Sequence, residues 1–403
     1  MTHITCVHQG YELYGSDRSF VESVRIMRMT YPQAEIDVVL PREGPIVEPL
    51  RELATRIVVE PLWVLRRRDL PRLATLGLAT LPLAVARAIR RIRRSDLVYV
   101  NTSVVADYLL AAGLSPGRTV LHVHEIAEGP VRAGLRALAR WGRPRIVFNS
   151  RATQRAFAMP ASIPQDVVYN GIADPGRPKA MTYDGTRPLR LLMLGRISRI
   201  KGQDVLLRAI AGMPAALRER IELRIVGSAF EDPERERRLS ATIAEAGLGD
   251  RAVHLPFTAD PDEHFRWADV AVVPSRLPES LGRVAIEAMA YGVPPLVSEI
   301  GGLPEVVEDG RTGWIVRPDD ADALACALAA IIAKPRDWAS FPQAARMRYE
   351  RVFAQDACAS RFVACLGAAL AGRGRAASGG GMPGGAAAVV NAPCHGPEAE
   401  WRS

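Results

Sequence analysis

Short runs of aliphatic and β-branched residues alternate with longer stretches in which apolar residues recur at helical spacing, and this alternation continues along most of the chain. The runs predict two series of strands. The first series comprises residues 4–7, 36–40, 97–100, 119–123 and 146–148. The second comprises residues 189–194, 222–226, 253–255, 270–273, 295–297 and 313–316. Strands that alternate with helical stretches such as 205–211 and 234–246 are typical of parallel sheets covered by helices on both faces.

A segment rich in proline and glycine, residues 174–188, separates the two series and is predicted to be an interdomain linker. The predicted fold is therefore α/β, with two doubly wound, Rossmann-like domains that face each other across a cleft. We expect an N-terminal domain over 1–175, a linker over 176–188 and a C-terminal domain over 189–341. Residues 342–370 are predicted to be helical and to pack back across the domain junction, and residues 371–403 are expected to be disordered.

The charge balance bears on the choice of partners. Of the 403 residues, 52 are Lys or Arg against 44 Asp or Glu, which gives a formal charge of +8. Nearly all of this positive charge is Arg, which suits phosphate and carboxylate, although a genome rich in G and C would also favour Arg. No basic surface interleaved with aromatic residues is recognisable, so nucleic acid is not an expected partner.

The cysteines and the apolar segments indicate a cytoplasmic protein. The five cysteines form no Cys-x-x-Cys pair, which favours reduced thiols. No secretory signal is recognisable at the N-terminus. The longest uncharged stretch, residues 73–86, is shorter than the roughly 20 residues that a membrane-spanning helix needs.

The strongest chemical signal follows the strand predicted at 270–273. The sequence Pro-Glu-Ser-Leu-Gly at 278–282 precedes a helix, so Ser280 is predicted to cap it, with the backbone amides of Leu281 and Gly282 facing an anion. Glu287 lies two turns into the helix and suits a ribose diol, while Glu279 lies ahead of the helix and suits a sugar. The alternative is that both glutamates are ordinary surface acids.

A second signal comes at the end of the strand predicted at 189–194. Gly195 permits a tight turn, and Arg196 and Lys201 then emerge at the carboxyl end of the sheet. Two such cations would neutralise a diphosphate, most of all in a transition state in which a leaving diphosphate gains charge. The alternative is a solvated basic loop.

With these motifs, the chain resembles glycosyltransferase family 4, whose members have the GT-B fold, over roughly residues 1–370. Further motifs match in order, namely Tyr-Asn-Gly-Ile at 169–172, Gly-Gly-Leu-Pro-Glu at 301–305 and Asp-Gly-Arg-Thr-Gly at 309–313. The resemblance implies a retaining transferase that uses a nucleotide-diphosphate sugar and needs neither a metal ion nor a cofactor. It also implies that Arg196 and Lys201 hold the diphosphate, Glu287 the ribose and Glu279 the transferred sugar.

The N-terminal domain contributes His122-Val123-His124-Glu125 at the end of a predicted strand. Alternation places the two histidines on the same side of that strand. The resemblance implies that His124 lies near the sugar and the acceptor, so His124 joins Glu279, Arg196 and Lys201 in the expected catalytic set. Glu125 would orient the ring or the acceptor. Packed histidines without a catalytic role, or a metal-binding pair that lacks a visible third ligand, remain open.

The turn after the first strand reads Tyr-Gly-Ser-Asp-Arg at 14–18. Gly15 would let the backbone approach the donor phosphate or the acceptor, and Ser16 or Asp17 would cap the following helix on the acceptor side. Many relatives have two consecutive glycines here, whereas this chain has Tyr14-Gly15. The turn is not a Gly-x-Gly-x-x-Gly fingerprint, which argues against a dehydrogenase.

Arginines flank the apolar stretch 73–86, and this pattern predicts a peripheral helix on anionic lipid at the inner face of the cytoplasmic membrane. They are Arg66, Arg67, Arg68, Arg72, Arg87, Arg90, Arg91, Arg93 and Arg94. The acceptor would then be lipid-linked or close to the membrane, and the alternative is a core helix with a solvated basic end. The family resemblance implies a role in cell-surface glycan or polysaccharide assembly. A nucleotide-sugar epimerase and a non-catalytic nucleotide-sugar-binding subunit are the other functions that the sequence leaves open. A phosphorylase of this fold would need a lysine for pyridoxal phosphate, and the context of the three lysines argues against one.

Overall fold

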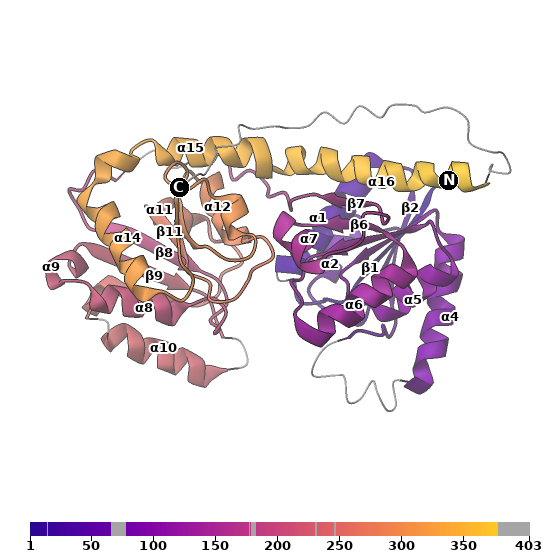
Figure 1. Cartoon of the computed structure of the whole chain (residues 1–403), viewed down its shortest axis with the longest axis horizontal. Helices are drawn as coiled ribbons and strands as arrows, with labels where there is room; N and C mark the ends of the chain where they lie inside the picture. Colours follow the sequence, from indigo (N-terminus) through magenta and orange to yellow (C-terminus); the bar gives the residue numbers. More distant parts are fainter. Residues whose placement is uncertain are drawn as a thin grey trace.

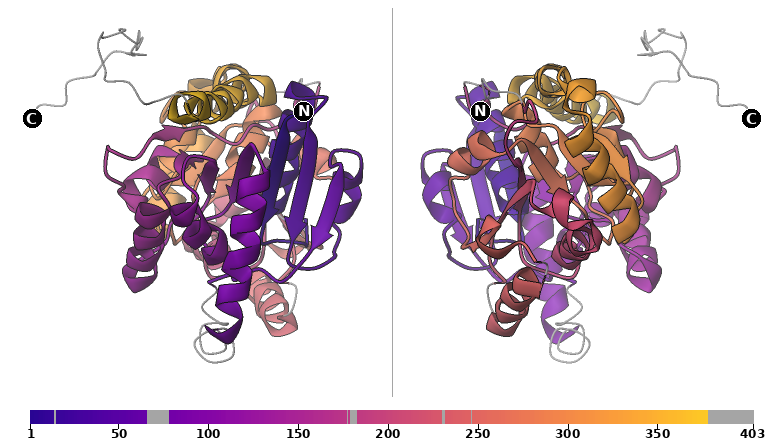
Figure 2. Two further views of the ribbon diagram at one scale, coloured as in Figure 1. Left: turned by 90° about the vertical axis from the view of Figure 1, so that its right-hand side faces the viewer. Right: turned by 90° about the vertical axis from the view of Figure 1, so that its left-hand side faces the viewer.

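The protein folds into two Rossmann-like domains that lie side by side in the computed structural model (Figure 1). The structure describes residues 1–13, 15–65, 78–176, 178, 183–229, 232–245 and 247–377. Two helices near the C-terminus run along one edge of both domains, and the three views agree on this placement (Figures 1 and 2).

The N-terminal domain contains a seven-stranded parallel sheet in the order β3-β2-β1-β4-β5-β6-β7. The strands are β1 His3–His8, β2 Glu35–Leu40, β3 Arg56–Val59, β4 Leu97–Asn101, β5 Thr119–Val123, β6 Arg145–Phe148 and β7 Gln165–Val167. The helices are α1 Gly15–Thr30, α2 Val47–Arg51, α4 Leu78–Arg94, α5 Ala106–Leu114, α6 Gly129–Gly142 and α7 Arg151–Phe157. The sequence analysis did not predict the edge strands β3 and β7. Both are only partly buried, the apolar run of β3 is confined to residues 57–59, and β7 begins with two polar residues.

The C-terminal domain contains a six-stranded parallel sheet in the order β10-β9-β8-β11-β12-β13. The strands are β8 Leu189–Leu194, β9 Ile221–Val226, β10 Ala252–Leu255, β11 Val270–Val273, β12 Pro295–Ser298 and β13 Trp314–Val316. The helices are α8 Gln203–Gly212, α9 Ala215–Arg218, α10 Pro233–Glu245, α11 Asp262–Trp267, α12 Arg283–Ala290, α13 Leu303–Val306 and α14 Ala321–Ala333. The predicted two-domain α/β fold is confirmed.

Central strands of both sheets are buried on both faces. Every residue of β4 and of β11 is buried, as expected for parallel strands between two helical layers. The strand order reverses between β1 and β4 in the first sheet and between β8 and β11 in the second. Ligands of doubly wound sheets bind beyond the carboxyl ends of the strands at such reversals, so these two points are where a site is expected.

The C-terminal segment crosses from the second domain to the first. The single helix predicted at 342–370 is two helices, α15 Phe341–Arg348 and α16 Gln355–Ala377, joined by one π-helical turn, Tyr349–Phe353. The π-helical turn packs against α12 of the C-terminal domain, whereas Phe362 and Leu366 of α16 enter the N-terminal core. Helix α16 extends to Ala377, past the expected start of disorder at 371, and residues 378–403 lie outside the described chain.

Beside the break between α15 and α16 runs the segment that leads to the linker. Ile172 pairs with Ala354 as a parallel bridge, in which the Ile172 amide donates to the Phe353 carbonyl at 3.0 Å. The Ile172 carbonyl accepts from the Gln355 amide at 3.1 Å and from the Tyr349 hydroxyl at 2.9 Å. The two covalent connections between the domains are therefore hydrogen-bonded to each other.

Helix α4 carries the described part of the segment for which membrane contact was predicted. Its apolar side is in the domain core, where Ala84, Ala88 and Ile92 are buried. Its outer side leaves Leu83 63% exposed and also exposes Arg90. The alternative of a core helix therefore accounts for most of its apolar residues, and residues 66–77, including four of the flanking arginines, lie outside the described chain. Within the described residues, every helix is too short or too polar to cross a bilayer.

Candidate functional site

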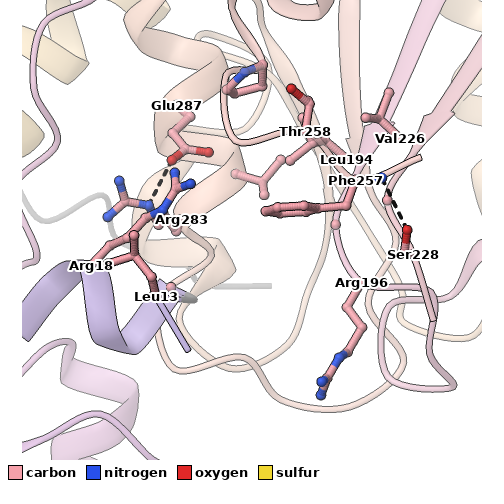
Figure 3. Close-up of a pocket in the computed structure, with 15 residues that line it drawn as sticks. Leu13, Arg18, Leu194, Arg196, Val226, Ser228, Phe257, Thr258, Arg283 and Glu287 are labelled. Atoms are coloured by element: carbon pink, nitrogen blue, oxygen red, sulfur yellow. Dashed lines mark hydrogen bonds and ion pairs between the residues drawn. The ribbon is translucent and has the colours of Figure 1, made fainter. Parts of the chain in front are cut away.

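A cavity of about 290 Å³ opens between the two domains, beyond the carboxyl ends of β8, β9 and β10 and at the start of α1 (Figure 3). Its lining residues are Leu13, Gly15, Arg18, Leu194, Gly195, Arg196, Val226, Gly227, Ser228, Phe257, Thr258, Pro261, Arg283, Val284 and Glu287. The cavity therefore lies beside the strand-order reversal of the C-terminal sheet, where the fold places a ligand.

Three arginines and one carboxylate give the cavity a positive balance. Arg18, Arg283 and Glu287 lie together on one side, and Arg196 lies on the other side (Figure 3). Arg283 donates from Nε to Glu287 Oε1 at 2.7 Å, and Arg18 donates from Nη2 to the Ala259 carbonyl at 3.3 Å. The second bond joins the two domains. An excess of guanidinium groups in a partly enclosed site favours a polyanionic ligand such as a diphosphate.

An apolar wall faces these charges. It is formed by Leu194, Val226 and Phe257, and the Phe257 amide donates to Ser228 Oγ at 3.2 Å. The Phe257 side chain is 48% exposed although it lines the cavity. A wall of this kind can accept a flat aromatic group such as a nucleobase.

Lys201 and Glu279 form an ion pair next to the cavity rather than in its lining. Lys201 Nζ lies 2.9 Å from Glu279 Oε2, and the Ser275 hydroxyl donates to the other oxygen of Glu279. Gly195 separates this pair from the cavity, since a Cβ at Gly195 would lie 3.8 Å from Lys201 Cε. Of the four charged residues predicted for the site, Arg196 and Glu287 thus line the cavity, whereas Lys201 and Glu279 pair with each other beside Gly195.

The turn at Gly195 depends on close backbone packing. Gly195 has φ +144°, and Gly227 at the end of the next strand has φ +150°. A Cβ on Gly227 would lie 2.0 Å from the Gly195 carbonyl oxygen. The two glycines therefore let the loops after β8 and β9 meet at the cavity wall.

The prediction that Ser280 caps α12 is wrong. The cap is Gly282, in the left-handed conformation with φ +88°, and its backbone rather than a hydroxyl begins the helix. The Ser280 hydroxyl instead accepts from Asn149 Nδ2 of the N-terminal domain at 3.1 Å. Leu281 is buried, and a Cβ on Gly282 would lie 2.3 Å from Leu303 Cδ2. Gly282 therefore lets the start of α12 pack closely on Leu303, and Arg283 and Val284 of the first turn line the cavity.

The Gly-Gly-Leu-Pro-Glu motif at 301–305 supports this loop and joins the domains. A Cβ on Gly301 would lie 2.2 Å from the Glu279 carbonyl oxygen, so the motif packs directly on the loop that precedes α12. The Glu305 carboxylate accepts from the backbone amides of Arg151 at 2.8 Å and Ala152 at 2.5 Å. It also accepts from the Tyr169 hydroxyl at 3.1 Å.

His124 is not among the residues that line the cavity. Its Nε2 lies 2.8 Å from Asn101 Oδ1 and its Nδ1 lies 3.4 Å from Asn170 Nδ2. Burial, followed by the neighbouring His8, lowers the pKa of His124 to about 3, so the ring is neutral near pH 7. The His122 ring lies 3.9 Å from that of His124 and is fully enclosed, where burial lowers its pKa well below the usual range.

The other N-terminal candidates differ in their surroundings. Glu125 accepts from the Thr102 hydroxyl and, at 3.2 Å, from the Ser103 hydroxyl, so its carboxylate is anchored to the loop after β4. Asp17 is buried and lies 2.8 Å from His8 Nε2. Ser16 is exposed, and Tyr14 lies outside the described residues.

Gly10 and Gly15, which lie between His8 and Asp17 in the sequence, differ in their surroundings. Gly15 lines the cavity but a Cβ there would meet nothing within 4 Å, whereas a Cβ on Gly10 would lie 1.8 Å from Asp17 Oδ1. Sequence analysis missed Arg18, Arg283 and Phe257 as cavity residues. A signal existed for two of them, since Arg18 ends the first turn and Arg283 directly follows the glycine that begins α12.

Two facing Rossmann-like domains with a basic cavity between them define a protein of the GT-B class. Among solved structures of this class, Anabaena Alr3699/HepE in complex with UDP and glucose has a TM-score of 0.73 and 23% identity, over 91% of this chain and 100% of that one. A glycosyltransferase from Rickettsia africae has a TM-score of 0.76 and 15% identity, over 92% and 98%. Residues 184–349, which span most of the C-terminal domain, match the family of glycosyl transferases group 1.

Curated relatives match over the same part of the molecule. The D-inositol 3-phosphate glycosyltransferase of Geodermatophilus obscurus is 40% identical over 153 residues, which cover 36% of this chain and 33% of the relative. The enzyme of the same name from Paenarthrobacter aurescens is 39% identical over 156 residues, which cover 37% and 38%. The chain therefore spans about a third of the length of these relatives.

Proposed function

We propose that the protein is a retaining, metal-independent glycosyltransferase that moves a sugar from a nucleotide-diphosphate donor to a glycan or lipid-linked acceptor. The observation that carries the proposal is the cavity between the domains, where three arginines and Glu287 face an apolar wall at the start of α12. This combination matches the three parts of such a donor, which are a polyanionic diphosphate, a ribose with a diol and a flat base.

The diphosphate would lie between Arg196 and the N-terminus of α12. There the amides that follow Gly282 and the positive end of the helix dipole meet its oxygens. Arg18 would approach from the other domain. When the bond to the sugar breaks, the leaving diphosphate gains charge, and these fixed positive groups would stabilise it most at that moment. We assign neutralisation of this charge to the arginines and to the helix N-terminus.

The base and ribose would occupy the remaining two sides of the cavity. Phe257 and Val226 offer the base an apolar surface, and the Glu287 carboxylate offers two acceptors to the ribose diol. Some neighbours of known structure were solved with UDP, which makes uridine diphosphate the first nucleotide to test.

The sugar would lie toward the Lys201–Glu279 pair. In the absence of a donor, Lys201 and Ser275 occupy the two oxygens of Glu279. A bound diphosphate would attract Lys201, which releases one carboxylate oxygen for a hydroxyl of the sugar. Donor binding would thus exchange one ion pair for two charge-assisted contacts, each contributing about 1.5–3 kcal/mol.

The acceptor would enter from the N-terminal domain, on the side of His124 and Glu125. The outer face of α4, with Leu83 and the exposed arginines of its last turns, is the surface that we assign to anionic lipid. A membrane-proximal acceptor is consistent with that surface.

The test combines binding with chemistry. A thermal-shift panel of UDP, GDP, ADP and their sugars should show stabilisation by one nucleotide class, because a ligand of the folded state raises stability by mass action. The matching sugar nucleotide should then be hydrolysed or transferred with retained anomeric configuration by proton NMR, and EDTA should leave the rate unchanged. Binding without turnover would favour a non-catalytic nucleotide-sugar-binding subunit, and interconversion of donor sugars would favour an epimerase.

A further inference from the structure

Five polar side chains form one continuous path from α1 to the segment before the linker. Asp17 Oδ1 lies 2.8 Å from His8 Nε2, and His8 Nδ1 lies 3.0 Å from Asn101 Nδ2. Asn101 Oδ1 lies 2.8 Å from His124 Nε2, and His124 Nδ1 lies 3.4 Å from Asn170 Nδ2. Asp17, His8 and Asn101 are 4%, 1% and 0% exposed. These groups are therefore shielded from solvent and make their hydrogen bonds with protein groups.

With the amide nitrogen of Asn101 toward His8, the first part of the path determines the protons on His8. A carboxylate only accepts, so His8 Nε2 carries a hydrogen toward Asp17. The Asn101 amide nitrogen only donates, so His8 Nδ1 must carry a lone pair. The amide oxygen of Asn101 is then directed away from His8.

The second part fixes His124. The Asn101 oxygen faces both the Tyr99 hydroxyl at 2.8 Å and His124 Nε2 at 2.8 Å, and it can only accept. His124 Nε2 therefore carries the hydrogen and Nδ1 the lone pair. The Tyr99 hydroxyl directs its single proton toward two acceptors, Asn101 Oδ1 at 2.8 Å and Ser23 Oγ at 3.1 Å. His122 Nδ1, 2.6 Å from the hydroxyl oxygen, must therefore donate to it.

We infer that Asp17 and His8 are positioning residues which, through Asn101, hold His124 as the neutral tautomer with its proton on Nε2 and an accepting Nδ1. Their effect on catalysis rests on the proposed function, in which His124 lies on the acceptor side. In the absence of substrate, the accepting nitrogen is held by the long contact with Asn170. A hydroxyl of the sugar or the acceptor would replace that amide as the donor.

Gly10 shows that the fold makes room for the first link of the path. A Cβ at this position would lie 1.8 Å from Asp17 Oδ1 and 2.7 Å from His8 Nε2. Any side chain here would separate the carboxylate from the imidazole. Gly10→Ala therefore provides a second way to break the path without removing either charged group.

One other arrangement of protons satisfies the same path. His8 Nδ1 also lies 3.2 Å from the Asn101 carbonyl oxygen, which would accept from a doubly protonated His8. The Asn101 amide would then be reversed, and His124 Nε2 would carry the lone pair. The two arrangements give His124 opposite tautomers, so one spectrum distinguishes them.

The test is long-range proton–nitrogen NMR on the full chain labelled with ¹⁵N-histidine, without substrate at pH 7.5. Single substitutions of His8, His122 and His124 by Gln assign the signals. We expect His8 and His124 to be protonated on Nε2 and the adjacent His122 on Nδ1. A His124 signal from the Nδ1-protonated form, or from averaged tautomers, would overturn the inference.

Steady-state kinetics then test whether the orientation of the His124 ring affects catalysis. Asp17→Asn should lower kcat on the order of tenfold, as loss of a partner behind a functional histidine commonly does, and leave the donor KM unchanged. The matched control is Asp37→Asn, which alters another buried carboxylate of the same sheet, bound to His3 and Arg56. Equal losses in the two variants would overturn the positioning role. If the wild-type chain turns over no donor, the proposed function fails, while the spectrum still decides the tautomer.

Discussion

Glu305 of the C-terminal domain accepts hydrogen bonds from the backbone amides of Arg151 and Ala152, which begin helix α7 of the N-terminal domain. The residues that flank these amides, Asn149 and Thr153, both contact Ser280 in the loop before α12. Closure of the domains and the shape of the candidate donor loop are therefore linked through one short stretch of α7.

Glu305→Gln should loosen this contact, because the amide keeps one accepting oxygen and loses the charge. We expect the interdomain contact to weaken by about 1–2 kcal/mol. Small-angle X-ray scattering should show a larger radius of gyration for the variant, and saturating nucleotide should reduce the difference. The exposed Glu299→Gln is the control, and equal scattering from both variants would refute the link.

Arg196→Ala should lower kcat/KM for the donor on the order of 100-fold, because a positive group that meets the leaving diphosphate is lost. The control is Arg199→Ala, three residues along the same loop, which lines a different surface pocket. Its kcat/KM should stay within about twofold of the wild-type value. Steady-state hydrolysis of the sugar nucleotide measures both variants, and a similar loss in both would remove Arg196 from the site.

Gly282→Ala should destabilise the C-terminal domain, because the new Cβ both meets Leu303 and occupies a left-handed backbone. We expect the free energy of unfolding to fall by about 2–4 kcal/mol. Gly310→Ala introduces a left-handed alanine without a clash and should cost about 1 kcal/mol. Urea denaturation followed by circular dichroism compares the two, and an equal loss would show that Leu303 does not constrain the position.

The pH dependence of stability should reveal the raised pKa of the buried Asp107 carboxyl. Burial, its largest cause, raises the pKa of Asp107 from 3.8 to about 6. Between these values the folded chain binds more protons than the unfolded chain, so this carboxyl lowers stability as the pH rises from about 4 to 6. The free energy of unfolding of Asp107→Asn, relative to that of the wild type, should therefore rise by up to about 3 kcal/mol between pH 4 and pH 7.5.

Urea unfolding at both pH values measures this difference. The exposed Asp250→Asn should show the same stability relative to wild type at both pH values. A pH-independent difference for Asp107→Asn would show that the carboxyl ionises as readily in the folded chain as in the unfolded chain.

Replacing both Leu83 and Arg90 by Glu should abolish any binding of the chain to phosphatidylglycerol vesicles. The change removes an exposed apolar side chain and reverses a charge on the outer face of α4, and each basic residue near an anionic surface contributes about 1 kcal/mol. Vesicle co-sedimentation at low salt measures the effect. Leu114→Glu, at an exposed leucine of the same domain, should bind as wild type does, and failure of the wild-type chain to sediment would exclude the lipid surface.

The continuous apolar runs of the central strands made most of both sheets predictable. Strands β5, β8 and β11 have the predicted bounds, because their residues are buried between helices and read as short apolar blocks. The edge strands β3 and β7 escaped prediction, since β3 has an apolar block of only three residues and β7 begins with two polar residues. The break at Ala354 escaped prediction because a π-helical turn preserves helical composition on both sides.

The residues of the candidate site were predictable where they belong to one sequence motif. They were not predictable where folding brings together residues that are far apart in the sequence. Arg196 and Glu287 follow motifs that end a strand or begin a helix, and both line the cavity. Ser280 looked like a cap because its hydroxyl precedes a helical pattern, yet a left-handed glycine two residues later begins the helix. The path from Asp17 to His124 joins residues from four separate segments, so no local pattern marks it.

The bridge between Ile172 and Ala354 has a mechanical consequence. The two segments that connect the domains, one at Ile172 before the linker and one at Ala354, lie side by side and are joined there by backbone hydrogen bonds. These hydrogen bonds resist sliding and separation of the two connections at the junction. Ile172 and Ala354 pack in the same apolar cluster as Val284, which lines the cavity, so a backbone change at this junction acts directly beside the site.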